Sequence, residues 1–324
     1  MFVIKVDGPG SRARHLLSAF ALLIAGAFLA LGACGPALAQ EKGTLHPKPL
    51  PPLANPHDPR LPAKDLFARA LKPTSGPAKV IGFYAAGCLA GARPLPWDGD
   101  AWQVMRPSRN RYWGDPYLLS FLENTARRAK ASGIWPGFLV GDIAQPRGGP
   151  MLAMHVSHQV GLEADIWFRP MPDRKLSMSD RERMMSTVLV RKDRLDVDPK
   201  TWRPADLNIL RFVAKQPEVL RIFVNPAIKK AICRETSGLR PWLGKIRPEY
   251  GHISHFHVRL VCPPGQPLCR NQFAPPKRAD CGKSLAWWFS PQVLHPKPNP
   301  HYKPRPPITL AQLPRACRAV LGAK

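Results

Sequence analysis

The segment GHISHFH, residues 251–257, holds three of the ten histidines in the chain. If this region is a strand, successive side chains point to opposite faces, so His255 and His257 share one face. The positions between and after them are apolar and are expected to face the core: Phe256, Val258 and Leu260. Two imidazoles on one face of a rigid strand suit a metal ion, and His252 adds a third imidazole nearby.

A second group of candidate ligands lies earlier in the chain, within residues 155–167. It supplies His155, His158 and Asp165, and Gly161 permits a turn between His158 and the strand predicted to carry Asp165. The two groups together hold five of the ten histidines. Because histidines with separate structural roles would be scattered, this concentration predicts one shared site.

Two neutral imidazoles and one carboxylate are typical of a zinc ion with three protein ligands and an open fourth position. Zinc lowers the pKa of a water in that position to roughly 7, which provides a hydroxide nucleophile near neutral pH. The sequence contains no His-Glu-x-x-His segment, so it is not a zinc peptidase with both histidines on one helix. A structural zinc site would be closed and rich in cysteine, and no Cys-x-x-Cys spacing occurs. His and Asp ligands do not exclude other first-row metals.

The body that must position these residues is bounded by two proline-rich stretches. The chain has 324 residues, of which 44% are hydrophobic and 39 are proline. The prolines gather at Pro47–Pro62 and Pro291–Pro307, which lack an apolar period and are predicted to be extended. We therefore predict the following organisation: a signal peptide at 1–39, an N-terminal arm at 40–64, a folded zinc-binding domain at 65–290, and a tail at 291–324 packed back on it.

Residues 1–39 have the pattern of a secretory signal peptide. A positively charged start is followed by the apolar run Leu16–Leu31, which is short for a membrane span, and by a small-residue cleavage site at Ala37–Ala39. An alternative is a lipoprotein signal with lipid on Cys34, which the cleaner Ala-Leu-Ala site disfavours. The protein is therefore expected in the periplasm.

Cysteine count and charge limit the partners of the exported chain. Six cysteines follow residue 39, and an even number in an oxidising compartment suggests disulfides; Cys262 and Cys269 bracket a short loop that they could close.

The formal net charge is +26, which favours anionic partners such as the cell wall or a membrane surface. Nucleic acid is not expected, because the chain is exported and shows no basic helix or aromatic-rich binding motif. The sequence leaves an oligomer open.

The coarse pattern of elements predicts an α+β fold without regular βαβ alternation or internal repeats. Helices are expected where a capping residue or a proline precedes an apolar stripe: after Asp115, over 184–190 behind a Ser179–Glu182 capping box, from Pro204 to Ala214, and from Pro226 to Cys233. Strands are expected at 164–168, 218–224 and 255–261.

Beyond these patterns, His158-x6-Asp165 followed by His255-x-His257 resembles the LAS metallopeptidases, which comprise lysostaphin-type enzymes, D-Ala-D-Ala peptidases and the hedgehog fold. More closely, the chain resembles the penicillin-insensitive murein endopeptidase family over roughly residues 70–320. Several unrelated segments match in order: RNRYWGDP at 109–116, GDIAQPRGG at 141–149, SHQVGL at 157–162 with DIW at 165–167, residues 246–262, and DCG at 280–282 with WW at 287–288.

The resemblance implies a small antiparallel sheet with flanking helices and a site in a groove over that sheet. It implies that His158, Asp165 and His257 bind one zinc ion and that His255 is the catalytic histidine. His155 also matches a family histidine and is a candidate further zinc ligand. His252 is a candidate catalytic group on the substrate side. For both His155 and His252, an orienting hydrogen bond is the alternative.

The implied reaction is hydrolysis of the peptide cross-bridge in peptidoglycan, at the bond between D-alanine and meso-diaminopimelate, by zinc-bound hydroxide. No serine nucleophile is needed, and no Ser-x-x-Lys motif is present. The resemblance also implies three disulfides: Cys88–Cys317, Cys233–Cys281 and Cys262–Cys269. Some members of the family have a second zinc, but the comparable stretch from Asp193 through Asp196 to Asp198 lacks histidine, so one ion is expected.

Two other functions fit the same sequence less well. A wall-binding protein that kept the fold without activity would be expected to lose a ligand or His255, and none is missing. A purely structural zinc protein fits poorly with a three-ligand site of mixed His and Asp type. Digestion of muropeptides, with a His255→Ala variant and a chelator as controls, discriminates among the three.

Overall fold

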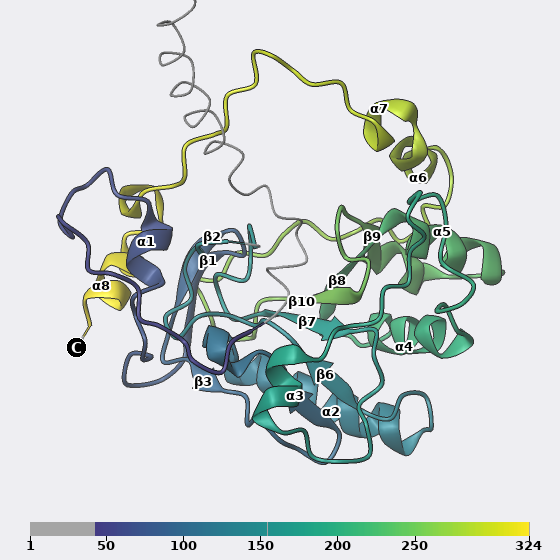
Figure 1. Ribbon diagram of the computed structural model, residues 1–324, viewed down its shortest axis with the longest axis horizontal. Helices are drawn as coiled ribbons and strands as arrows, with labels where there is room; N and C mark the ends of the chain where they lie inside the picture. The colour runs from purple at the N-terminus through teal and green to yellow at the C-terminus, as the bar shows by residue number, and fades with distance from the viewer. Residues whose placement is uncertain (1–42, 154, 324) are drawn as a thin grey trace, which may run out of the picture. The chain divides into compact units, whose positions relative to one another are not determined.

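A six-stranded sheet forms the centre of the fold (Figure 1). The computed structural model describes residues 43–153 and 155–323, so the predicted signal peptide lies outside the described residues. The strand order is β4-β6-β7-β10-β8-β9, with bounds Trp102–Val104, Phe138–Val140, Glu163–Trp167, His255–Leu260, Val219–Val224 and Ile246–Pro248.

The pairing directions of this sheet are mixed. β7 pairs antiparallel with β6 and β10, and β10 pairs antiparallel with β8, whereas the outer pairs β4–β6 and β8–β9 are parallel. The α+β class is therefore confirmed, and the expected antiparallel pairing holds for the four central strands but not for the two outer pairs. Each edge strand has only three residues and runs parallel to its neighbour. Two small antiparallel ladders complete the strands: β1 (Lys79–Phe83) with β2 (Ala86–Ala90), and β3 (Arg93–Pro94) with β5 (Trp113–Gly114).

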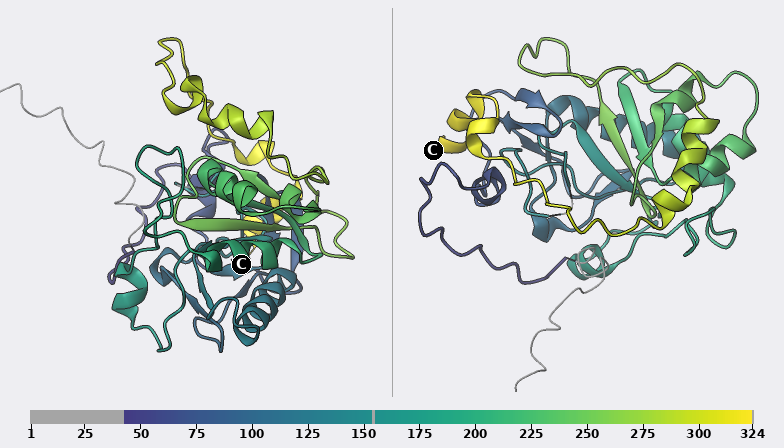
Figure 2. Two further views of the ribbon diagram at one scale, coloured as in Figure 1. Left: turned by 90° about the vertical axis from the view of Figure 1, so that its right-hand side faces the viewer. Right: turned by 90° about the horizontal axis from the view of Figure 1, so that it is seen from above.

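Three helices flank the sheet and share its core (Figure 2). α2 (Pro116–Ala131) begins after Asp115, whose side chain accepts a hydrogen bond from the Tyr117 amide at 2.9 Å, as the sequence predicts. α4 (Pro204–Ala214) has the predicted bounds, and α5 (Pro226–Glu235) ends two residues later than expected. Their apolar faces pack on the central strands, where side chains of β8 and β10 are fully buried: Ile222, Val224, Val258 and Leu260.

The predicted helix over 184–190 is wrong. The helix in this region is α3 (Met178–Arg183), and its capping box is formed by Ser177 and Asp180, two residues before the pair that the sequence suggested. Glu182 is fully buried, and its carboxylate accepts hydrogen bonds from the Ser108 amide and hydroxyl, both at 2.8 Å. Because Ser108 takes this carboxylate, Glu182 is not free to cap a helix that follows it.

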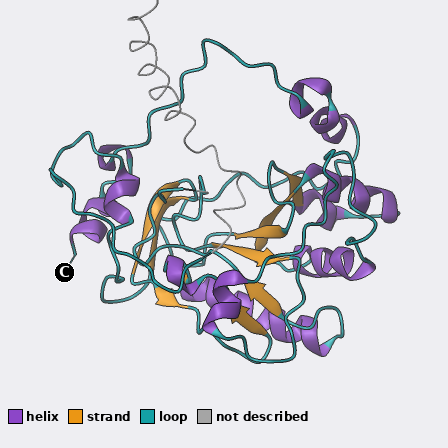
Figure 3. Cartoon of the chain, viewed as in Figure 1, coloured by secondary structure: helices purple, strands orange, loops and turns teal. Residues whose placement is uncertain are grey.

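The first and last helices of the described residues lie side by side near the β1–β2 ladder, where Figure 1 shows α1 (Ala63–Phe67) next to α8 (Ala316–Gly322). Phe67 of α1 is fully buried in a cluster with Ile81, Leu313 and Val320. The disulfide Cys88–Cys317 lies in the same cluster and joins β2 to α8. The exposed residues 295–307, which lead along the chain back to this end, form an irregular loop without helices or strands (Figure 3).

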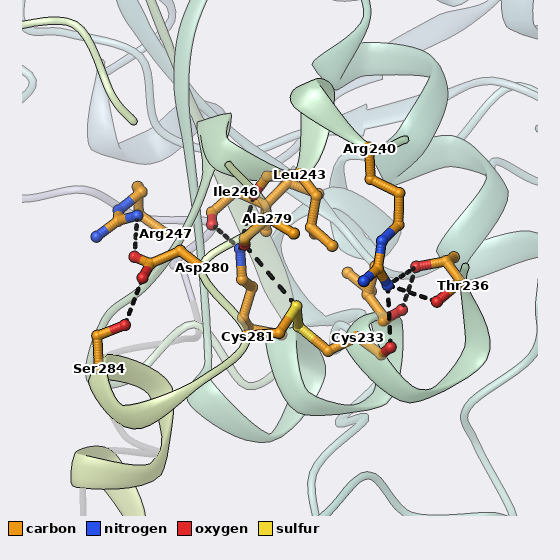
Figure 4. Close-up of a disulfide and its surroundings, with 12 residues drawn as sticks. Cys233, Thr236, Arg240, Leu243, Ile246, Arg247, Ala279, Asp280, Cys281 and Ser284 are labelled. Carbon is orange, nitrogen blue, oxygen red and sulfur yellow. Dashed lines mark hydrogen bonds and ion pairs between the residues drawn. A yellow bond between two sulfur atoms is a disulfide. The ribbon is translucent and has the colours of Figure 1, made fainter. Parts of the chain in front are cut away.

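A second disulfide, Cys233–Cys281, joins α5 to the segment before α6 (Lys283–Ala286), which is followed by α7 (Pro291–Leu294). Figure 4 shows the polar contacts around it, among them the Arg247–Asp280 ion pair at 2.7 Å. The fully buried Lys229 ammonium donates to three carbonyls here, those of Leu243, Ile246 and Ala279.

The third disulfide, Cys262–Cys269, closes the loop after β10, so all three predicted pairings are confirmed. Within residues 43–153 and 155–323, the helices are too short or too polar to cross a bilayer.

Candidate metal centre and active site

Strand register brings together two of the predicted ligands. β10 runs antiparallel to β7 with His257 opposite Asp165, and opposite residues in such a pair project from the same face. His158 reaches the same point from the loop before β7, where its backbone has a left-handed φ of 65°. The turn to the strand passes through Gly161 at φ 68°, where a Cβ atom would lie 2.4 Å from the Leu89 side chain. Glycine is therefore required at this turn.

The three potential ligand atoms have the spacing of a tetrahedral metal site. His158 Nε2 lies 3.1 Å from His257 Nδ1 and 3.4 Å from Asp165 Oδ1, and the last two atoms are 3.5 Å apart. Ligands at about 2.0–2.1 Å from a tetrahedral zinc ion are separated from one another by about 3.3 Å. Because the three separations lie close to that value, one ion fits among the atoms without large movement.

The Asp165 carboxylate provides an independent test of this fit. Its Oδ1 atom is buried and accepts no hydrogen bond from the described residues. A buried oxygen without a partner costs free energy, and a cation is the partner that suits a carboxylate. The side chains around it are well enclosed, since His158, Asp165 and His257 are 0%, 6% and 5% exposed. The residues present therefore fit a bound metal ion.

Hydrogen bonds on the far side of each imidazole fix which nitrogen faces the site. His158 Nδ1 donates to the Ile143 carbonyl at 2.6 Å, which leaves Nε2 for the ion. His257 Nε2 donates to the Glu163 carboxylate at 2.7 Å, which leaves Nδ1. Both assignments follow because a carbonyl and a carboxylate can only accept. Such outer contacts orient metal-binding histidines and set their tautomers.

Glu163 is a residue of the site that sequence reasoning missed. It is fully buried on β7, and besides His257 it accepts hydrogen bonds from the His158 amide at 2.6 Å and from Arg259 Nε at 2.7 Å. Arg259 lies opposite Glu163 in the β7–β10 register. The alternation of side chains along a strand could have indicated both residues, because Glu163 shares a strand face with Asp165 and Arg259 shares one with His257.

His155 and Asp142 form a hydrogen-bonded pair next to the proposed ligand Asp165. His155 Nε2 lies 2.9 Å from Asp142 Oδ2 and 3.7 Å from Asp165 Oδ2. His155, His158 and Asp165 thus form a group whose ligand atoms all lie within 4.8 Å of one another. Asp142, which was also missed, is buried and accepts from Arg109 at 3.3 Å and Arg111 at 2.9 Å.

His255 lies at the open side of the site. Its Nε2 is 3.7 Å from Asp165 Oδ1, and 28% of its side chain is exposed. The His252 ring packs against it at 5.0 Å, and His252 Nδ1 donates to the Tyr250 carbonyl at 2.8 Å. A cavity of about 70 Å³ lies in front of these groups, with Trp167, Ser186 and Ser254 among its lining residues. All six predicted site residues therefore belong to one connected cluster.

The electrostatics of the cluster favour a cation at its centre. Burial opposes charge on His158, but the Asp165 carboxylate overrides it and raises the pKa of His158 to about 9. Burial, with the neighbouring His158, lowers the pKa of His257 to about 3. Although burial opposes it, the surrounding histidines hold the pKa of Asp165 well below its usual range. The Asp165 carboxylate and the two imidazole nitrogens therefore favour positive charge at the place where the spacing fits a metal ion.

The acidic turn that was considered for a second metal has cationic partners. Asp193 pairs with Arg191, and Asp196 pairs with Arg234 at 2.8 Å and with Lys230 at 3.4 Å. The Leu195 amide, which donates to Asp193 at 3.0 Å, and then Arg191 lower the pKa of Asp193, whereas Arg234 lowers the pKa of Asp196 against the opposing effect of burial.

Known proteins are similar to this chain over most of its length. The family model described as penicillin-insensitive murein endopeptidase matches residues 80–322. A protein of that name from Haemophilus influenzae is 43% identical over 257 residues, which cover 79% of this chain and 86% of the relative. A protein of the same name from Yersinia enterocolitica is 40% identical over 77% of this chain and 87% of its own length. Another, from Pectobacterium atrosepticum, is 38% identical over 80% of this chain and 89% of its own length.

Proposed function

We propose that this chain, which belongs to the penicillin-insensitive murein endopeptidase family, is a zinc-dependent enzyme that hydrolyses peptide cross-bridges of peptidoglycan. Family membership makes the chain a peptidase that acts on murein. The finer proposals are the metal, the mechanism and the bond, which we take to be the one between D-alanine and meso-diaminopimelate. The observation that carries the metal proposal is the buried Asp165 Oδ1, which accepts no hydrogen bond from the described residues and lies near two imidazole nitrogens.

We propose His158 Nε2, Asp165 Oδ1 and His257 Nδ1 as the zinc ligands. When bound there, zinc supplies a water of pKa near 7 and a Lewis acid for the scissile carbonyl. For His155, the 2.9 Å hydrogen bond with Asp142 favours an orienting role over a further metal contact. The donor set of two imidazoles and one carboxylate suits zinc and leaves a coordination position for substrate.

We propose His255 as the group that moves the proton. Partial burial lowers its pKa to about 4, so the ring is neutral near pH 7 and can accept a proton. Its Nε2 lies beside Asp165 at the exposed edge of the site, within reach of an attacking water and of the leaving amine. His252 is the proposed second catalytic group on the substrate side, and its bond to the Tyr250 carbonyl fixes the ring against His255.

An enzyme that acts on murein works in the cell-wall compartment, which is the periplasm. The three disulfides agree with an oxidising location. We further propose that residues 1–39 are the export signal and that residues 65–290 form the zinc endopeptidase domain.

Digestion of purified cross-linked muropeptide dimers, followed by chromatography, tests the proposal. The zinc-loaded protein should convert dimers to monomers, and removal of the metal with a chelator should stop the conversion. His255→Ala should lower the rate by at least about a hundredfold, the usual contribution of a general acid or base. His301→Ala, in the exposed tail, is the matched control and should cleave at the normal rate. Dimers left uncut by metal-loaded protein would instead support a wall-binding module.

A further inference from the structure

A large cavity lies beside the active site and is walled partly by the proline-rich arm. Its volume is about 760 Å³, within the range of ligand-binding clefts. One wall is the arm segment 47–52, and the other includes residues 107–112 of the body. The arm lies outside the family match at 80–322, so this wall is a feature of this chain rather than of the matched region.

Specific contacts hold the arm in place. The Gly43 amide donates to the Glu182 carbonyl at 3.0 Å, and the Thr44 amide donates to the Ser108 hydroxyl at 3.2 Å. At the other end, Arg69 Nη2 donates to the Pro51 carbonyl at 2.7 Å. Figure 1 shows the arm in purple between these points, from the vicinity of α3 to α1. Its prolines fix φ, which lowers the entropic cost of an ordered wall.

Arg109 lies between the large cavity and the active site. This residue lines both the large cavity and the small cavity in front of His255. Its guanidinium donates to Asp142, which in turn is bonded to His155 of the metal-site cluster. Ser108, which anchors the arm, is the preceding residue. A ligand in the large cavity is therefore separated from the small cavity in front of His255 by a single shared residue, Arg109.

The chemistry of the walls indicates the ligand. The basic residues Lys48, Arg69, Arg109 and Arg111 line the cavity, and none of the described lining residues is acidic. Asp142 lies behind Arg109 and Arg111 and balances one of these charges. Prolines, Leu50, Leu71 and Tyr112 supply apolar surface between the cations. Cationic groups alternating with apolar surface suit an extended peptide that carries carboxylates.

We propose that the arm and the 107–112 segment form a binding groove for an acidic peptide, which is the stem peptide of the murein substrate. This inference rests on the proposed function for the identity of the peptide. It assigns Lys48 to substrate binding and Arg69 to positioning the arm. Removal of the arm should therefore weaken binding of substrate while leaving the metal ligands in place.

Binding to a catalytically silent protein tests the groove directly. In the zinc-loaded His255→Ala protein, the affinity for a muropeptide dimer is measured by calorimetry, with an otherwise identical dimer whose carboxylates are amidated as the second probe. Lys48→Gln, Arg69→Ala and deletion of residues 43–52 should each raise the Kd for the acidic dimer about tenfold, the effect of one lost charge-assisted hydrogen bond. Lys48→Gln should not change the Kd for the amidated dimer. Lys297→Gln, in the exposed tail, should not change the affinity for either probe.

Thermal melting shows whether each variant folds. If the deletion variant does not fold, the point variants still test the groove. Equal affinity of all arm variants and the parent for the acidic dimer would overturn the groove, as would a parent that does not bind it. Cleavage of dimers by protein with His255 intact is scored separately. Uncut dimers contradict the proposed function, whereas unchanged affinities contradict only the groove.

Discussion

Replacing Glu163 with glutamine should weaken metal binding without removing any proposed ligand. In the wild type, one carboxylate oxygen accepts from His257 Nε2 and Arg259 Nε, both at 2.7 Å, and the other accepts from the His158 amide at 2.6 Å. A glutamine has one accepting oxygen, so its NH2 group must face a donor whichever way it is turned. If it faces His257 Nε2, that nitrogen must become an acceptor, and the proton moves to Nδ1, the atom proposed to bind the ion.

The magnitude follows from what the variant loses. One hydrogen bond to a charged group is worth about 1.5–3 kcal/mol, which corresponds to an affinity loss of about tenfold to a hundredfold. Outer contacts to metal-binding histidines have effects of the same size. We therefore expect the zinc Kd of Glu163→Gln, measured by competition with a chelator of known affinity, to rise by about tenfold to a hundredfold. Excess zinc should restore much of the lost activity.

Glu182→Gln is the matched control, since Glu182 is also fully buried and hydrogen-bonded but contacts Ser108 instead of the metal-site histidines. It should lower stability without a comparable change in zinc affinity. A folded Glu163→Gln protein that binds zinc as tightly as the wild type would refute the argument that this carboxylate sets the His257 tautomer.

Two further predictions concern stability. Burial lowers the pKa of Lys229 from 10.5 to about 7, so between these values the unfolded chain binds more protons and stability rises with pH. The free energy of unfolding is measured in urea for the wild type and for Lys229→Met. The difference between the two should rise in favour of the wild type by up to about 1.4 kcal/mol per pH unit from pH 7 to 9. A difference that does not change with pH would contradict this prediction. Replacing Cys88 and Cys317 by serine should cost about 5 kcal/mol, against about 2 kcal/mol for Cys262 and Cys269, because the sequence separations are 229 and 7 residues. Denaturation that shows the reverse order would contradict the loop-entropy argument.

The sequence predicts the metal-site cluster well for a physical reason. Side-chain direction alternates along a strand, so the spacing of His255 and His257 determines that both share a face. The sequence does not determine the register between two strands. The pairing of His257 with Asp165 depends on how β7 and β10 align, and these strands are far apart in the chain.

The missed contacts have different causes. Glu163 and Arg259 were detectable by the same alternation, but an isolated charged residue on a strand is usually solvated, so it carries little signal. The Ile143 carbonyl that orients His158 is a backbone group and has no sequence signature. The erroneous helix after Glu182 arose because two Ser-x-x-acid pairs overlap in this region, and only tertiary contacts with Ser108 decide between them.

The central claim is that His158, Asp165 and His257 bind one metal ion, and anomalous diffraction from crystals of the zinc-loaded protein tests it most directly. The account predicts a single strong peak at the zinc absorption edge, about 2.0–2.2 Å from His158 Nε2, Asp165 Oδ1 and His257 Nδ1. A peak elsewhere in the protein, with no metal bound to Asp165 Oδ1, would contradict the account.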